Sequence, residues 1–216
     1  MKVLTIATEL KPTLEKLVKS CEGKLDLEVT FHPGKWDWGV WLDWQDEKSS
    51  EYWDHSLVFV DAYDTLFVGG PDELERLVER QPLIHSTCKN CWPMPAREKF
   101  YPKVPGPWKF LNSCGPAGAG WAIGNALEYG MNTFPYPMPD LSRDNDQRFW
   151  TDVYLSWPGC LDWRCEIWQD LHLMETGEIV LKDGKAYNTV HNTYPQFLHA
   201  SAGTWHLIPE ELLHGR

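Results

Sequence analysis

The chain has 216 residues, with 20 basic and 31 acidic side chains and a formal net charge of −11. This length favours one domain, and we expect residues 1–216 to form a single domain. A composition that is 43% hydrophobic and 24% charged excludes disorder, and the acidic balance disfavours a protein that tracks nucleic-acid phosphates.

The N-terminal segment is a short apolar stretch, Lys2–Thr8, which predicts a strand and is too short for a signal peptide. No apolar run approaches the roughly 20 residues that span a bilayer, so we expect a cytoplasmic protein with no membrane partner. After this strand, apolar periodicity and breaker residues predict a helix around 14–21, a strand at 25–31, a helix within 33–54, a strand at 56–60, a helix at 71–80 and a strand at 83–87.

The second half of the chain has more irregular segments. It predicts a proline-rich irregular stretch at 91–107, a strand at 109–112, a glycine-rich segment at 115–120 leading into a helix through about 129, a loop at 132–140, a helix at 146–155, a strand at 165–169 and a hairpin at 179–188 that turns on Asp183-Gly184. Alternating strands and helices indicate an α/β domain whose sheet is mainly parallel and flanked by helices.

Tryptophan is unusually abundant. Of the 13 tryptophans, five lie close together at Trp36, Trp38, Trp41, Trp44 and Trp53. Such large apolar rings are expected in the core or along a groove for a flat ligand, and core packing is the expectation for most of them.

Asp61 and Asp64 carry the most informative pattern, because they follow a continuous apolar strand directly. In open α/β sheets, ligands bind at the carboxyl ends of the strands. Burying two negatively charged carboxylates there without a cation would cost several kcal/mol. A Mg²⁺ or Mn²⁺ ion that bridges the carboxylates to substrate phosphates would neutralise these charges. The alternative is that Asp61 is a turn residue and Asp64 is solvated.

Seven motifs follow one another along the chain: the run from Leu57 to Leu74, Cys91-Trp-Pro93, Tyr101-Pro102, Phe110-Leu-Asn-Ser113, Asp144-Asn-Asp-Gln-Arg-Phe-Trp150, Leu161-Asp-Trp-Arg-Cys-Glu-Ile-Trp-Gln169 and His199. In this order they resemble one known family, the glycosyltransferase domain of the procollagen lysyl hydroxylases and collagen galactosyltransferases. The resemblance implies the GT-A fold, a Rossmann-like mixed sheet, and a glycosyltransferase that uses a UDP-sugar and Mn²⁺.

The resemblance also implies the metal ligands and the nucleotide contacts. Asp61, Asp64 and His199 would hold Mn²⁺ on the donor diphosphate, and an imidazole among oxygen ligands favours Mn²⁺ over Mg²⁺. Tyr63 would stack on the uracil, and Trp36 and Val40 would cover the ribose. For His199 alone, an ordinary core or surface histidine is the alternative.

The remaining site residues implied by the resemblance face the transferred sugar. Asp146 is the first candidate and Asp144 the second for a carboxylate near the anomeric carbon, acting as a base or stabilising positive charge. Further contacts to the donor would come from Asn112, Asn145, Gln147 and Trp92. Asp144 could instead cap a helix, and Trp92 could equally be a packing residue.

The sequence departs from the family pattern at two places. Cys114-Gly115-Pro116 replaces a pair of glycines, and Ala200–Thr204 lacks the lysine that the family places after its metal-binding histidine. A non-catalytic nucleotide-sugar-binding module therefore stays open, as does a metal-dependent phosphohydrolase or nucleotidyltransferase. A zinc site built from Cys88, Cys91, Cys160 and Cys165 is a weaker alternative to free buried thiols.

The acceptor is the least defined part of the prediction. The resemblance suggests a hydroxyl of a hydroxylysine-type peptide or of a hydroxylated small molecule. A rival is a hydroxymethylated DNA base, as in viral DNA glycosyltransferases, which needs an extruded base beside a basic groove. The only modest basic cluster is Lys89, Arg97, Lys99, Lys103 and Lys109, interleaved with Trp92 and Trp108.

Overall fold

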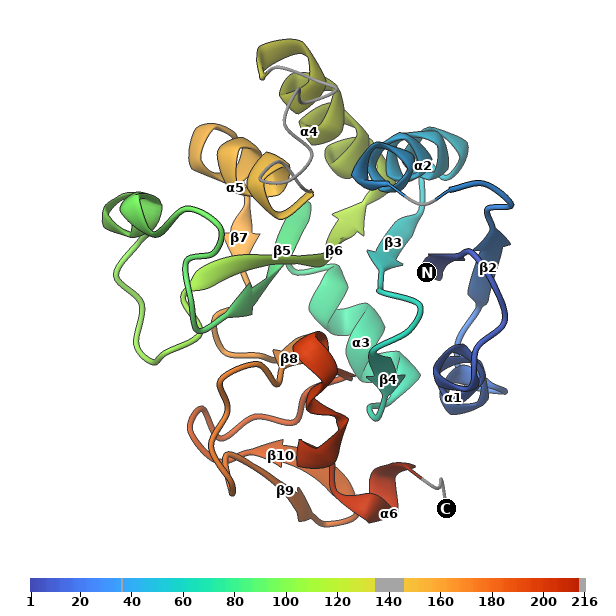
Figure 1. The fold of residues 1–216 in the computed structure, drawn as a ribbon, viewed down its shortest axis with the longest axis vertical. Helices are drawn as coiled ribbons and strands as arrows, with labels where there is room; N and C mark the ends of the chain where they lie inside the picture. The colour runs from blue at the N-terminus through green and yellow to red at the C-terminus, as the bar shows by residue number, and fades with distance from the viewer. Residues whose placement is uncertain (36, 135–145, 214–216) are drawn as a thin grey trace.

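The structure is a computed structural model that describes residues 1–35, 37–134 and 146–213. Its centre is a six-stranded sheet in the order β2-β1-β3-β6-β5-β7 (Figure 1). Neighbouring strands are parallel except β6, which is antiparallel to both β3 and β5. This arrangement confirms the predicted mixed α/β fold. The strands are β1 (Lys2–Ala7), β2 (Leu27–Phe31), β3 (Ser56–Phe59), β5 (Leu83–Cys88), β6 (Phe110–Ala119) and β7 (Cys160–Leu161).

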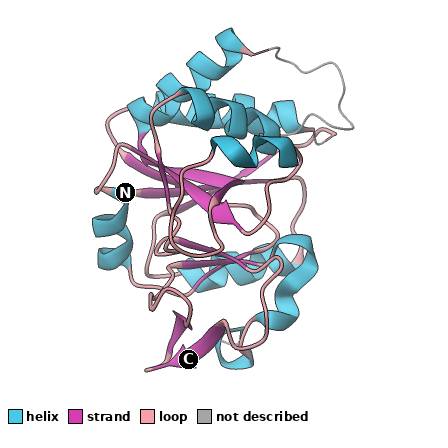
Figure 2. Ribbon diagram, turned by 90° about the vertical axis from the view of Figure 1, so that its left-hand side faces the viewer, coloured by secondary structure: helices cyan, strands magenta, loops and turns pink. Residues whose placement is uncertain are grey.

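Both faces of the sheet are covered, because successive side chains of a strand point to opposite faces. Leu4 and Ile6 of β1 pack in the core under α2 (Trp38–Glu51), α4 (Gly120–Thr133) and α5 (Asp146–Ser156). Val3 and Ala7 pack in the opposite core, together with α1 (Pro12–Cys21) and α3 (Pro71–Val78). Figure 2 shows the central strands beneath the first of these helical layers.

A second, three-stranded sheet lies below the central one. It contains β4 (Thr65–Phe67), β11 (Phe197–His199) and β8 (Trp168–Asp170), with β11 in the middle, antiparallel to β4 and parallel to β8. The sequence predicts a strand at 165–169, shifted from β8, and does not predict β4 or β11. Strands of three residues are too short to show an alternating pattern, so only tertiary pairing defines them.

Strand β6 is longer than the sequence predicts. The expected strand at 109–112 continues through the glycine-rich segment to Ala119. Gly115 and Gly118 are required there by close packing, because a Cβ atom would lie 1.9 Å from the carbonyl oxygen of Phe59 and 2.0 Å from that of Pro82, respectively. These glycines allow two backbones to approach each other rather than forming a turn.

The remaining elements surround this framework. The predicted hairpin is confirmed as β9 (Ile179–Lys182) and β10 (Lys185–Asn188), joined through Asp183 and Gly184 at positive φ. Two 3₁₀ segments, η1 (Pro95–Phe100) and η2 (Ser201–Leu207), and the short helix α6 (Glu210–Leu213) complete the described chain. Within the described ranges, none of the helices has the length and apolarity needed to cross a membrane.

Candidate functional site

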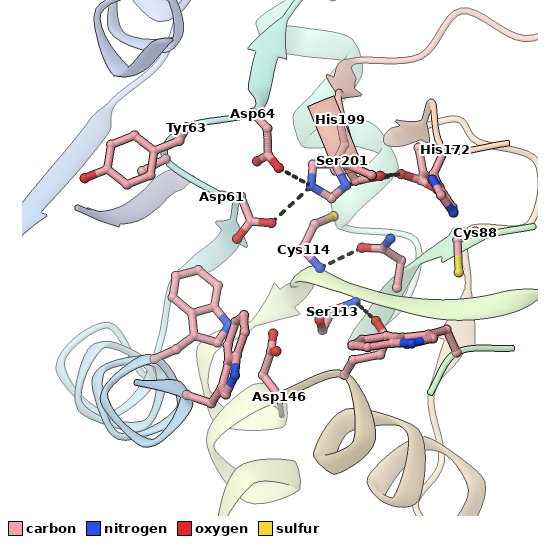
Figure 3. Close-up of a pocket in the computed structure, with 18 of the residues that line it drawn as sticks. Asp61, Tyr63, Asp64, Cys88, Ser113, Cys114, Asp146, His172, His199 and Ser201 are labelled. Carbon is pink, nitrogen blue, oxygen red and sulfur yellow. Dashed lines mark hydrogen bonds and ion pairs between the residues drawn. The ribbon is translucent and has the colours of Figure 1, made fainter. Parts of the chain in front are cut away.

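A cavity of about 720 Å³ opens between the two sheets, beyond the ends of β1 and β3. Segments far apart in the sequence contribute to its wall (Figure 3). They include the loop after β1, the start of α2, the turn after β3, the middle of β6, the start of α5 and the segment after β11. The cavity therefore lies where the sequence predicts ligand binding in an α/β fold.

Asp61, Asp64 and His199 come together in this cavity. Nε2 of His199 lies 3.1 Å from Oδ2 of Asp61 and 3.4 Å from Oδ2 of Asp64. One ligand atom of each residue lies within 4.8 Å of the others. The backbone fixes this arrangement, because His199 of β11 pairs with Thr65 of β4, and the amide of Ala200 donates to the carbonyl oxygen of Asp64 at 2.6 Å.

The charges in this cluster are strongly coupled. Desolvation, together with the charge of Asp64, raises the pKa of Asp61 to about 6. Burial disfavours the charged imidazole of His199, but the neighbouring carboxylates, Asp64 first, outweigh burial and raise its pKa well above the ordinary value. The two carboxylates therefore favour the protonated form of the imidazole, at the place where a cation could sit.

The donor set fits a divalent cation. His199 is 3% exposed, and Nε2 of its ring faces one carboxylate oxygen each of Asp61 and Asp64. A divalent cation bound among these three atoms would offset the two carboxylate charges that burial makes costly. Two carboxylates and one borderline imidazole form a mixed O/N ligand set that divalent metal ions accept.

Tyr63 lies to one side of the cluster (Figure 3). Its hydroxyl accepts hydrogen bonds from the backbone amides of Thr8 at 2.9 Å and Glu9 at 3.0 Å. The ammonium group of Lys11 lies 4.5 Å from the centre of its ring. Tyr63 is thereby tethered to the loop after β1, with its ring at the wall of the cavity.

Asp146 is the first residue of α5 and is only 5% exposed, although it lines the cavity. Desolvation raises the pKa of Asp146 to about 7, and the nearby charge of Asp61 adds to this effect, while a hydrogen bond from Ser113 opposes it. A carboxyl group with this pKa can exchange a proton near neutral pH.

Two other residues predicted to contact the sugar donor, Gln147 and Asn112, form hydrogen bonds to the backbone of β6. The side chain of Gln147 accepts from the amide of Ser113 at 2.8 Å and donates to the carbonyl oxygen of Leu111. Oδ1 of Asn112 accepts from the amide of Cys114 at 2.8 Å. Both residues line the cavity, and their internal hydrogen bonds fix the shape of its wall.

The aromatic wall differs in detail from the predicted one. Trp92 lines the cavity and is 56% exposed. Val40 lies in the first turn of α2, where its amide donates to Asp37, and it packs against the core without lining the cavity. Trp38 and Trp41 line the cavity instead. Their three-residue spacing could have indicated a shared helix face. The predicted residues Trp36, Asp144 and Asn145 lie outside the described residues.

Sequence reasoning also missed two polar cavity residues, Asp170 and His172. Asp170 ends β8, with Oδ1 at 3.5 Å from Nδ1 of His199. His172 follows two residues later and is partly buried. Nothing in the sequence pattern marks them, because their position depends on the pairing of β8 with β11.

The structure supports neither a cysteine zinc site nor a fully unpaired basic cluster among the described residues. Among the described residues, Asp61, Asp64 and His199 are the group that could hold an ion, and the cysteines form no such group. Within the basic cluster three of the five side chains form ion pairs: Lys89 with Glu178, Arg97 with Asp152 and Lys109 with Glu98. Three of the five positive charges therefore have an acidic partner, and the Lys89–Glu178 pair is largely buried.

Comparison with known proteins gives one consistent result. The sequence model of the PLOD GT domain matches residues 41–208. The chain is 31% identical to human "Multifunctional procollagen lysine hydroxylase and glycosyltransferase LH3" over 177 residues, which are 76% of this chain and 23% of that protein.

Two further relatives come from a nematode and a virus. The chain is 28% identical over 227 residues to the "Multifunctional procollagen lysine hydroxylase and glycosyltransferase" of Caenorhabditis elegans, covering 92% of this chain and 30% of that protein. It is 28% identical over 154 residues to "Uncharacterized protein R699" of Acanthamoeba polyphaga mimivirus, covering 68% and 32%. The chain thus spans between about a quarter and a third of the length of these relatives.

Proposed function

Since the chain belongs to the family of the PLOD glycosyltransferase (GT) domain, we propose that it transfers a sugar from a UDP-sugar to an acceptor hydroxyl with the help of Mn²⁺. The observation that carries this proposal is the Asp61, Asp64 and His199 cluster, in which a buried imidazole nitrogen faces two carboxylate oxygens. These three residues would hold the cation. When bound, the cation would supply Lewis-acid stabilisation of the departing diphosphate.

The protein's own residues would orient the donor on both sides of this cluster. Tyr63 lies on one side and Asp146 on another (Figure 3). We place the uracil against the Tyr63 ring, whose position is fixed by the backbone of Thr8 and Glu9. The sugar then lies toward β6 and α5, where Asn112 and Gln147 form the wall.

Asp146 is proposed as the carboxylate that acts on the reacting centre. Its low exposure keeps water away, and its raised pKa lets it accept a proton from an attacking hydroxyl near neutral pH. In its charged form it would equally stabilise positive charge on the sugar ring. Because both roles require the carboxylate, a substitution that removes it from Asp146 should abolish transfer in either case.

The segment that lacks the family lysine retains a role in the site. Ala200 is buried, and Ser201 lines the cavity with its hydroxyl donated to Asp170. Lys11 and His172 are the other basic side chains that line the cavity beside His199. We propose that they and the metal ion meet the charge of the diphosphate in place of that lysine.

For the acceptor, we propose a hydroxylysine-type peptide or a hydroxylated small molecule. Ion pairing in the basic cluster favours these acceptors over a hydroxymethylated DNA base, because a phosphate-tracking groove needs unpaired cations. Transfer of radiolabelled sugar to a hydroxylysine peptide and to hydroxymethyl-DNA, run side by side, tests this choice. We expect label in the peptide, and label in the DNA alone would contradict it.

UDP release tests the class of activity even when the acceptor is not known. Incubation with several UDP-sugars and Mn²⁺ should release UDP from at least one of them. UDP binding without release for every donor and acceptor tried would instead indicate a nucleotide-sugar-binding module. Cleavage of simple phosphate esters or nucleotidyl transfer would indicate the phosphohydrolase or nucleotidyltransferase alternative.

A further inference from the structure

A buried carboxylate lies on the side of His199 opposite to the candidate metal ligands. Asp170 is directly paired with His199 in the parallel strands β8 and β11. Its Oδ1 is 3.5 Å from Nδ1 of His199, while Nε2 of the same ring faces Asp61 and Asp64. The imidazole of His199 thus lies between Asp170 on its Nδ1 side and the carboxylates of Asp61 and Asp64 on its Nε2 side.

Asp170 is firmly fixed in this position. It is 1% exposed, and its backbone carbonyl accepts from Nε1 of Trp108 at 3.2 Å and from the side chain of Gln169 at 2.8 Å. The hydroxyl of Ser201 donates to Oδ1 of its side chain. Its other oxygen, Oδ2, is buried without a hydrogen-bond partner in the described part of the chain. A carboxylate this deeply buried is costly unless it has a specific partner.

We propose that Asp170, oriented by Ser201, is a positioning residue that keeps the proton of His199 on Nδ1 and so leaves Nε2 free to bind the metal. A histidine that binds a metal through one ring nitrogen carries its proton on the other, and the acceptor of that proton sets both the tautomer and the ring orientation. This inference rests on the proposed metal-dependent function and assigns a role to two residues outside the three ligands.

The packing excludes a simpler role for Asp170 as a fourth ligand. The group whose ligand atoms approach one another contains Asp61, Asp64 and His199, and Asp170 lies behind the imidazole ring. Ser201 belongs to the segment that departs from the family pattern, so its hydroxyl gives that segment a defined function in the site.

Titration calorimetry of the metal-free protein with MnCl₂ tests the proposal directly. Asp170→Ala should weaken Mn²⁺ binding by about 10- to 100-fold, the loss typical for partners of metal-bound histidines. Asp170→Asn, which keeps a carbonyl oxygen as acceptor, should restore most of the affinity. Ser201→Ala should weaken binding less than Asp170→Ala, and it serves as the second variant if Asp170→Ala does not fold.

Asp152→Ala is the matched control, since it also removes a largely buried carboxylate but lies in α5, paired with Arg97. It should leave the Mn²⁺ affinity unchanged, and thermal unfolding in EDTA should show that all variants are folded at the temperature of the titration. Wild-type affinity in both Asp170→Ala and Ser201→Ala would overturn the positioning role alone. Absence of Mn²⁺ binding in the wild type would instead overturn the metal site itself, and this inference with it.

Discussion

Thr65 and His199 face each other across the paired strands β4 and β11, although they are far apart in the sequence. This pairing places the imidazole beside the two carboxylates that follow β3, at 3.1 and 3.4 Å. The candidate metal site therefore exists only when the small sheet is formed. Substitution of a candidate metal ligand should disturb the site without opening a cavity in the hydrophobic core.

Loss of any one of the three ligands should abolish transfer while the fold survives. We expect Asp61→Asn, Asp64→Asn and His199→Ala each to lower the rate by orders of magnitude. Because the pKa of Asp61 is raised to about 6, its charged form is disfavoured in the metal-free fold, and Asp61→Asn should not lower the melting temperature in EDTA at pH 7.5. Calorimetric melting and UDP release measure the two effects. A variant that unfolds would make its loss of activity uninformative.

Tyr63 and Asp146 should affect different steps. Tyr63→Ala should weaken UDP binding by roughly 1–2 kcal/mol through lost ring contact, whereas Asp146→Asn should leave UDP binding near normal and reduce transfer. Tyr63→Phe keeps the ring but loses the contacts to Thr8 and Glu9, so it should fall between wild type and Tyr63→Ala. Titration calorimetry with UDP and Mn²⁺ checks this order. Equal losses of UDP binding in Tyr63→Ala and Asp146→Asn would show that nucleotide and sugar do not occupy separate parts of the cavity.

The pH dependence of transfer should report on Asp146. With its pKa raised to about 7, the carboxylate forms as the pH rises through that value, so the rate should increase between pH 6 and 8. A bound cation offsets the charge of Asp61 and moves the midpoint to lower pH. Rate profiles at saturating donor check this. A rate that falls over this range would contradict a role for the charged form.

Asp146 should make the folded protein less stable as the pH rises, whereas it should make transfer faster. A folded pKa of about 7, above the unfolded value, means that the protonated form of Asp146 stabilises the fold at low pH. This contribution is lost as the pH rises from about 4 to about 7. Asp146→Asn cannot lose it, so its melting temperature relative to wild type should increase over this range. A difference independent of pH would argue against burial of the charged group.

Charge reversal in the basic cluster distinguishes the acceptors. Lys99 and Lys103 are exposed, whereas Lys89, Arg97 and Lys109 are held by acidic partners. We expect Lys99→Glu and Lys103→Glu to leave transfer to a hydroxylysine peptide unchanged, with no effect on its dependence on salt. If these changes flatten a steep salt dependence, a nucleic-acid acceptor gains support.

Local patterns in the sequence were sufficient for the main framework. Strands β1, β2, β3 and β5, the helix that starts at Pro71 and the hairpin at Asp183-Gly184 follow from periodicity and turn residues, and Asp61 and Asp64 stand out at the end of a buried strand. The two-residue strand β7 and the second half of β6 were not predicted. β4 and β11 were missed because three residues carry no period. Asp170 was missed because its relation to His199 is a register between strands, which no local pattern encodes.

The most direct test of the metal-dependent mechanism is UDP release by the wild-type protein before and after removal of divalent cations. Asp64→Asn and Asp152→Asn should be assayed in parallel as the ligand variant and its control. We predict that EDTA abolishes release, that Mn²⁺ restores it more fully than Mg²⁺, and that only Asp64→Asn fails to respond. Full activity of the wild type in EDTA would contradict the metal-dependent mechanism.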